Sequence, residues 1–243
     1  MRKFQTLAGS AILALFSTAQ PLLAQADPAP LSSAIKLEAG RPHADELDQA
    51  VNLLLAGKPK EAEAIFSAII ADFEKTHDPA LPYRCAYSDT AKATIAYTLE
   101  DLKGKPFTLG GDVWCVALWG KGFALIDLNR SDEAGTFLAR SVEMAPVNAH
   151  YINEYAEWYK PRRDWKTSYA LFERAWRTVD HDSKGPNRTV AARALRGMAY
   201  NQIELGDLDR AEQLYKQSLE YEPEAAGKVN AELQFIAQQR AKR

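Results

Sequence analysis

The sequence predicts an all-α chain built from amphipathic helices that pair as antiparallel hairpins. Apolar residues recur at helical spacing from about residue 43 to the end, whereas few segments alternate apolar and polar residues as strands do. Short turns rich in glycine, proline or polar residues separate the helices of each pair. The pairs recur with a period of about 34 residues, which indicates a solenoid of stacked hairpins.

The first 26 residues have the organisation of a signal peptide. Arg2 and Lys3 give a positive start, residues 7–16 form an apolar run, and Ala24-Gln25-Ala26 is a typical cleavage site. The run is too short for a membrane span, which needs roughly 20 apolar residues. We therefore expect export to the periplasm, cleavage after Ala26 or Ala24, and no membrane span in the mature chain.

A proline-rich segment, residues 27–42, is the expected flexible lead-in to the helices. The first hairpin is expected over residues 43–76. Its first helix has one apolar stripe, formed by Leu47, Ala50, Val51, Leu54 and Leu55. Gly57 is suited to end that helix, and Pro59 is suited to begin the next because its missing N–H costs nothing there.

Further hairpins are expected over residues 115–148, 149–188 and 189–225, followed by a capping helix over 225–240. The helices are predicted near 114–128, 132–144, 149–160, 165–179, 189–205 and 208–221. The stretch 77–114 fits the period poorly, and we interpret it as a degenerate repeat with one helix near 87–103. A polar loop between residues 180 and 188 is the second break in the period.

Small residues and prolines at fixed positions of these hairpins resemble the tetratricopeptide-repeat family. Repeat positions eight, twenty and thirty-two hold Gly122, Ala134 and Pro146 in one unit, and Ala199, Ala211 and Pro223 in another. The run from Leu205 to Tyr215 is close to the family consensus for the turn and second helix. The resemblance covers about residues 43–76 and 115–225. It implies that the small residues lie where the two helices of a hairpin cross.

The chain has two cysteines, Cys85 and Cys115. Their spacing is not that of a Cys-x-x-Cys redox site. Because an oxidising compartment favours disulfides, we predict that the two cysteines form one bond with each other. Two buried free thiols are the alternative.

No motif for catalysis, metal binding or a cofactor is present. The four histidines are far apart and lack metal-ligand spacing; they are His43, His77, His150 and His181. Nucleophile elbows, phosphate-binding loops and dinucleotide fingerprints do not occur. The net charge of −2 without a long basic run does not suggest nucleic-acid binding. We therefore expect no catalytic residue, no metal and no cofactor.

The family resemblance implies a partner-binding groove on the concave face, lined by the first helix of each hairpin. Carrying over the groove positions gives these candidate partner-binding residues: Trp119, Phe123, Asn153, Glu157, Arg193, Arg196 and Tyr200. Aromatic residues beside arginines suit an extended peptide or a helix. Alternatively, Trp119 and Phe123 are core residues that pack against residues 77–113. The aromatic turn at residues 155–165 is either a second contact surface or a packed corner.

The sequence thus favours a non-catalytic periplasmic adaptor or scaffold that binds a protein or peptide partner. A cell-envelope enzyme or accessory subunit acting on cell-wall material is the alternative from another class. A structural part of an assembly complex is a third possibility. The identity of the partner cannot be read from these residues, because the fold alone implies only binding.

Overall fold

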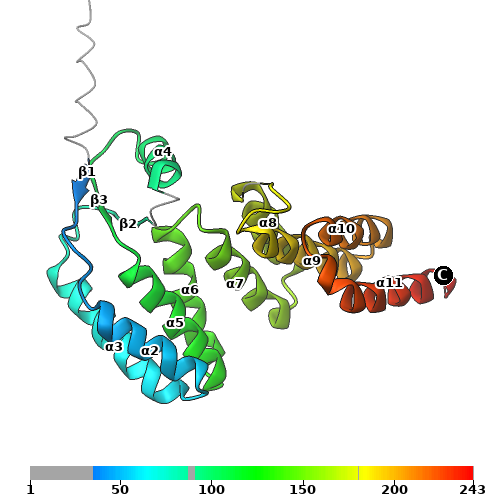
Figure 1. Ribbon diagram of the computed structural model, residues 1–243, viewed down its shortest axis with the longest axis horizontal. Helices are drawn as coiled ribbons and strands as arrows, with labels where there is room; N and C mark the ends of the chain where they lie inside the picture. Colours follow the sequence, from blue (N-terminus) through cyan, green and yellow to red (C-terminus); the bar gives the residue numbers. More distant parts are fainter. Residues whose placement is uncertain (1–34, 87–90, 180, 243) are drawn as a thin grey trace, which may run out of the picture.

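The computed structural model describes residues 35–86, 91–179 and 181–242, and the predicted signal peptide lies outside them. Successive helix pairs stack along the chain, from the first pair at one end to the C-terminal helix at the other (Figure 1). The pairs are α2 (Ala44–Leu55) with α3 (Pro59–Thr76), α5 (Val113–Asp127) with α6 (Ser131–Met144), α7 (Ala149–Tyr159) with α8 (Trp165–Thr178), and α9 (Arg188–Leu205) with α10 (Leu208–Tyr221). The predicted all-α hairpin solenoid is confirmed.

Local signals at the turns explain where these helices begin and end. Gly57 and Gly206 have positive φ angles of 69° and 87°, which glycine adopts without steric cost after a helix. Pro59 is the first residue of α3. The Asp207 carboxylate accepts a hydrogen bond of 3.0 Å from the Arg210 backbone N–H and so caps α10.

The helix crossings contain the small residues that the repeat pattern predicted. A Cβ atom on Gly122 would lie 2.8 Å from the Leu138 side chain and 3.5 Å from the Ala134 carbonyl oxygen. Ala199 and Ala211, the corresponding residues of the last pair, are both fully buried. The close approach of α5 to α6 therefore depends on the absence of a side chain at position eight.

Residues 77–114, interpreted from the sequence as a degenerate repeat with one helix near 87–103, contain that helix and also two strands that the sequence did not predict. This stretch contains strand β2 (Tyr83–Cys85), helix α4 (Ala91–Asp101) and strand β3 (Phe107–Gly110). Strand β1 (Ile35–Leu37), from the predicted lead-in, completes a parallel sheet with the order β1-β3-β2. Helix α4 lies within the helix predicted near residues 87–103. It connects two adjacent parallel strands, so the insertion is a β–α–β unit.

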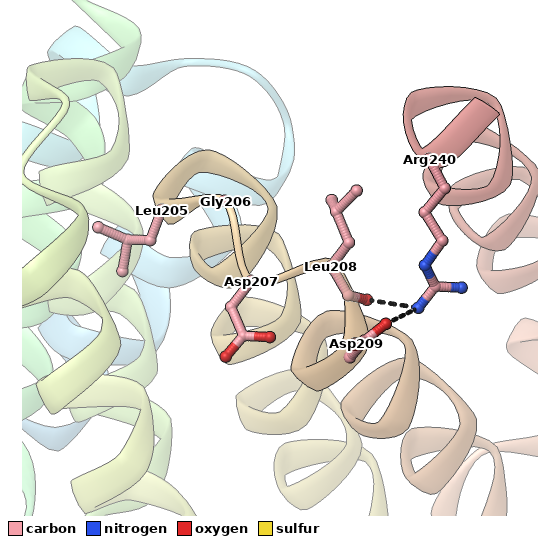
Figure 2. A pocket seen from close by; sticks show the side chains of 6 residues that line it. All are labelled: Leu205, Gly206, Asp207, Leu208, Asp209 and Arg240. Carbon is pink, nitrogen blue, oxygen red and sulfur yellow. Dashed lines mark hydrogen bonds and ion pairs between the residues drawn. The ribbon is translucent and has the colours of Figure 1, made fainter. Parts of the chain in front are cut away.

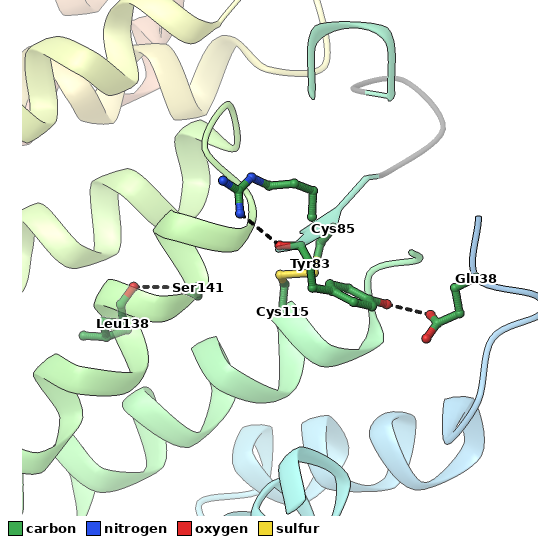
Figure 3. The surroundings of a disulfide bond; sticks show 7 residues. Glu38, Tyr83, Cys85, Cys115, Leu138 and Ser141 are labelled. Atoms are coloured by element: carbon green, nitrogen blue, oxygen red, sulfur yellow. Dashed lines mark hydrogen bonds between the residues drawn. A yellow bond between two sulfur atoms is a disulfide. The ribbon is translucent and has the colours of Figure 1, made fainter. Parts of the chain in front are cut away.

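The predicted disulfide is confirmed and joins this unit to the helices. Cys85, at the end of β2, is bonded to Cys115 in α5, with the Cα atoms 6.2 Å apart (Figure 3). Both cysteines are buried. Next to the bond, the Tyr83 hydroxyl donates a 2.6 Å hydrogen bond to Glu38, which follows β1. A Cβ atom on Gly110 would collide with that hydroxyl, so glycine is needed there.

Helix α11 (Ala226–Ala241) follows the last pair and covers its end. Val229 and Ile236 are its buried residues. The capping helix predicted over residues 225–240 corresponds to it. In the part of the chain that the structure describes, no helix combines the length and apolarity needed to cross a bilayer.

Candidate partner-binding groove

A pocket of about 240 Å³ lies between α7, α9 and α11. We call it the groove pocket. Its polar walls come from Glu157 and Lys160 at the end of α7, from Arg193, Arg196 and Tyr200 on α9, from Tyr215 on α10, and from Lys228 and Glu232 on α11. Gly197 and Val229 complete the lining. Residues three and four apart on a helix share one face, which explains why α9 and α11 each contribute several of these side chains.

Four of the seven predicted partner-binding residues line the groove pocket, namely Glu157, Arg193, Arg196 and Tyr200. They come from two successive first helices, α7 and α9, as the repeat pattern implies. The structure therefore brings together side chains that are more than thirty residues apart in the sequence.

Carboxylates fix the orientation of the two arginines. The Arg193 guanidinium binds both carboxylate oxygens of Glu154, with Nη2 to Oε2 at 2.8 Å. Burial alone would lower the pKa of Arg193, but the hydrogen bonds and charge of Glu154 outweigh it and raise the pKa. Arg196 Nη1 lies 2.7 Å from Glu222 Oε2. Each guanidinium is thus held in the wall of the pocket by a carboxylate.

The aromatic wall of the groove pocket is uncharged. Burial raises the pKa of the Tyr200 hydroxyl, and the nearby carboxylates Glu204 and Glu232 raise it further. Burial also raises the pKa of Tyr215. The Lys160 ammonium lies over the Tyr200 ring, 4.7 Å from its centre, and pairs with Glu157 at 2.9 Å. The two phenols can therefore donate hydrogen bonds at neutral pH.

Trp119 and Phe123 lie outside the groove pocket, on α5. Their rings are 5.0 Å apart, and Trp119 also contacts the rings of His150 at 5.2 Å and Tyr151 at 6.2 Å on α7. Both side chains are half-buried. We call Trp119 and Phe123 the aromatic patch; its ring contacts with other helices are with α7. His150 Nε2 in turn lies 4.0 Å from Glu154, so the aromatic patch continues into the ion pair that borders the pocket.

Asn153 is fully buried and is not presented to a partner. Its side-chain Nδ2 donates a hydrogen bond of 3.0 Å to the Val190 carbonyl oxygen. Val190 belongs to the first turn of α9. Asn153 therefore joins α7 to α9 from behind the groove rather than lining it.

The aromatic turn at residues 155–165 is a packed corner. The Trp158 indole N–H donates a 2.7 Å hydrogen bond to the Ser131 carbonyl oxygen. The Arg162 guanidinium covers the Trp158 ring, 3.5 Å from its centre, and pairs with Asp132 at 2.7 Å. Trp158 and Arg162 are thus used within the fold, which favours the packed-corner interpretation over a second contact surface.

Sequence reasoning missed the contributions of the last two helices to the groove pocket. Lys228 and Glu232 on α11 and Tyr215 on α10 line it, although α11 was expected only to cap the solenoid. The spacing of Lys228, Val229 and Glu232 places them on one side of a helix whose Val229 is buried. That spacing is the signal that could have identified them.

Helix α11 is fixed in place at its far end by Arg240. This guanidinium binds Asp209 and Glu212 on α10 and donates a 3.4 Å hydrogen bond to the Leu208 carbonyl oxygen. The contacts to Asp209 and Leu208 lie in a shallow depression at the α9–α10 turn, with a volume of about 600 Å³ (Figure 2). None of the predicted partner-binding residues lines this depression. Its side chains serve to position α11.

Among the described residues, no group of three or more His, Cys, Asp or Glu side chains is placed to hold a metal ion.

The comparison with known proteins agrees with this fold. The family model for the tetratricopeptide repeat matches residues 191–224. No curated protein matches the chain.

Two solved structures of MamA share the fold over most of this chain. MamA from residue 41 to its end, from Desulfovibrio magneticus RS-1, has 13% identity and a TM-score of 0.54, covering 84% of this chain and 88% of its own. A MamA structure from MSR-1 has 15% identity and a TM-score of 0.50, covering 81% and 85%.

The first tetratricopeptide-repeat domain of Spaghetti (RPAP3), bound to the HSP90 peptide SRMEEVD, has 21% identity and a TM-score of 0.46 over 52% of this chain and 93% of its own. Two features of the structure agree with the matched repeat. They are the small residues at the helix crossings and the stacking of the helix hairpins. Residues 191–224 thus match a tetratricopeptide repeat, and the helix pairs of this chain form a solenoid with the fold of the MamA structures.

Proposed function

We propose that the protein is a non-catalytic adaptor of the periplasm that holds a protein or peptide partner in the groove formed by its first helices. One observation carries the binding role: Glu157, Arg193, Arg196 and Tyr200, predicted from repeat positions, line a single pocket between successive first helices. Arginine and tyrosine are enriched among the residues that dominate interface energies.

The charged groups of the groove pocket suit recognition rather than catalysis. Arg193, Arg196 and Lys160 are each paired with a carboxylate, so their charges are fixed in space. Guanidiniums and ammonium groups held in this way can make directional hydrogen bonds to a bound chain.

Two features support the periplasmic location. The first 26 residues have the pattern of a signal peptide. The Cys85–Cys115 disulfide suits an oxidising compartment.

Affinity measurements test the binding role. A partner is first identified by pull-down from the cell envelope, and its affinity is then measured for Arg196→Ala and Tyr200→Ala proteins whose circular dichroism is unchanged. We expect a loss of about 1–2 kcal/mol or more at either site. Arg162→Ala, in the packed corner, is the control and should bind normally. A different outcome would place the site at the packed corner instead. In that case both groove variants would bind normally, and Arg162→Ala or Trp165→Ala would lose affinity for the partner.

A further inference from the structure

A second pocket, with a volume of about 350 Å³, lies outside the groove. We call it the insertion pocket, because β2 and α4 of the β–α–β unit form one side of it. The other side comes from α6 and α8, the second helices of their hairpins. None of its lining residues lines the groove pocket. A volume of this size suits a small molecule.

The alternation of side chains along β2 explains why Arg84 lines the insertion pocket. Successive side chains of a strand point to opposite faces. Cys85 points towards α5, where it is bonded to Cys115. Its neighbour Arg84 therefore points to the other face, where its Nη2 lies 3.3 Å from the Asp101 carboxylate on α4. The disulfide thus fixes the strand that carries this arginine.

The fold uses only part of the hydrogen-bonding capacity of Arg84. The side chain is only 7% exposed, and it donates long hydrogen bonds to the Tyr83 carbonyl oxygen at 3.2 Å and to Asp101 at 3.3 Å. A guanidinium has five N–H donors, so three remain. One of these, the buried Nε, has no acceptor within the part of the chain that the structure describes. Because unsatisfied buried donors are costly, this arginine indicates a ligand that supplies acceptors.

Two further charged groups line the insertion pocket without a partner of opposite charge. Arg174, on α8, donates a 2.6 Å hydrogen bond to the Pro146 carbonyl oxygen but pairs with no carboxylate among the described residues. Glu143, on α6, is exposed and forms no ion pair with any residue that the structure describes. Asp101 is already used by Arg84. The pocket therefore offers a ligand two guanidiniums and one unpaired carboxylate.

We propose that the insertion pocket binds a free amino acid, with its carboxylate on Arg84 and Arg174 and its ammonium group on Glu143. Guanidiniums bind carboxylates through paired, charge-assisted hydrogen bonds. Tyr97 and Val142 give the pocket an apolar surface for the rest of the ligand. A zwitterion also preserves the balance of two arginines and two carboxylates in the lining, which a simple anion or a simple cation does not. The site is separate from the groove, so its test does not depend on the groove or its partner.

A panel of free amino acids with apolar, polar and charged side chains supplies the probes. Isothermal titration calorimetry on the purified protein measures their dissociation constants. The amino acid that binds most tightly is then compared with its N-acetyl derivative, which lacks the ammonium group, and with its amide, which lacks the carboxylate.

The same three compounds are titrated into Arg174→Gln and Glu143→Gln proteins whose circular dichroism is unchanged. Arg177→Gln is the matched control, because Arg177 is an exposed residue of the same helix that does not line the insertion pocket. Arg84 is left in place, since it is buried and its removal would strand Asp101.

We expect both modified compounds to bind the wild-type protein about tenfold more weakly than the free amino acid, because each lacks one charged contact. Arg174→Gln should weaken the free amino acid by a similar factor but should not weaken the amide further. Glu143→Gln should weaken the free amino acid but should not weaken the N-acetyl derivative further. Arg177→Gln should bind all three compounds as the wild type does.

A lack of saturable binding by every amino acid in the panel overturns the site. Equal binding of the free amino acid and its N-acetyl derivative overturns the zwitterion. Unchanged affinity in both Arg174→Gln and Glu143→Gln, or an equal loss in Arg177→Gln, shows that any binding occurs elsewhere and also overturns the proposal.

Discussion

Glycine and alanine at the helix crossings set how closely the helices of this solenoid approach each other. Gly197, in the middle of α9, shows the requirement most directly. A Cβ atom there would collide with the ring of Phe172, which is fully buried and belongs to α8. Gly227, in the first turn of α11, has no atom within 4 Å of the corresponding position. Replacing glycine with alanine should therefore have opposite effects on stability at the two sites.

We predict that Gly197→Ala lowers the free energy of unfolding by about 1–3 kcal/mol, because the added methyl group overpacks the contact with Phe172. Gly227→Ala should instead stabilise by up to about 1 kcal/mol, since alanine favours the helix and meets open space. Urea denaturation followed by circular dichroism measures both values. A Gly197→Ala protein as stable as the wild type would show that α8 and α9 are less closely packed than described.

At the scale of elements, the helices were predictable and the strands were not. Each helix of the hairpins contains a long apolar stripe or the small residues of the repeat, whereas the strands have only three or four residues. A strand such as Phe107–Gly110 is buried at every position, so it has no alternation to detect. Its partner Ile35–Leu37 is about seventy residues distant in the chain. Parallel pairing over such a separation leaves no local sequence signal.

The candidate site was predictable where the repeat register holds. Arg193, Arg196 and Tyr200 line the groove pocket as the register implies. Asn153 does not, because the first turn of α9 lies over it and the Val190 carbonyl oxygen accepts its hydrogen bond. That turn follows the loop that breaks the period after residue 180. An insertion changes how neighbouring repeats meet, which repeat positions alone do not reveal.

The disulfide is a covalent cross-link between the β–α–β unit and helix α5. We predict that reducing it lowers the free energy of unfolding by about 3–4 kcal/mol, the chain-entropy value for a loop of this length. Its cysteines are 30 residues apart. Thermal unfolding with and without reductant measures the loss. A protein with both Cys85→Ser and Cys115→Ser is the control. Its melting temperature should not change when reductant is added. Equal melting temperatures for oxidised and reduced wild type would contradict the prediction.

At the scale of the whole molecule, different interactions hold the N-terminal and C-terminal parts of the chain in place. Near the N-terminus, β1 pairs with β3, and Glu38 accepts the hydrogen bond of Tyr83. At the C-terminus, α11 covers the last pair and Arg240 binds α10. Helix α11 covers a terminal unit of the solenoid, whose outer face would otherwise have no neighbour. The sheet contacts α5 and α6 through β2, and its first strand begins at Ile35, a few residues after the predicted cleavage site.

The position of β1 leads to a prediction about export. If the leader is removed after Ala26 or Ala24, a short segment remains before β1, and the described fold is retained intact. We therefore expect the chain recovered from the cell envelope to begin at Asp27 or Gln25, as measured by N-terminal sequencing. Mass spectrometry of the same protein after alkylation should show no modified cysteine, because Cys85 and Cys115 are bonded.

A variant without residues 1–26, retained in the cytosol, is the matched control for this prediction. Cytosolic thiol reductants should keep both of its cysteines reduced, so alkylation of the denatured variant should modify each of them. The comparison separates the effect of the compartment from the effect of the fold, because both proteins contain the same helices and strands. Wild-type protein that starts at Met1 in the cytosol would refute export. A leaderless variant that is oxidised in the cytosol would show that the fold itself, rather than the compartment, determines the bond.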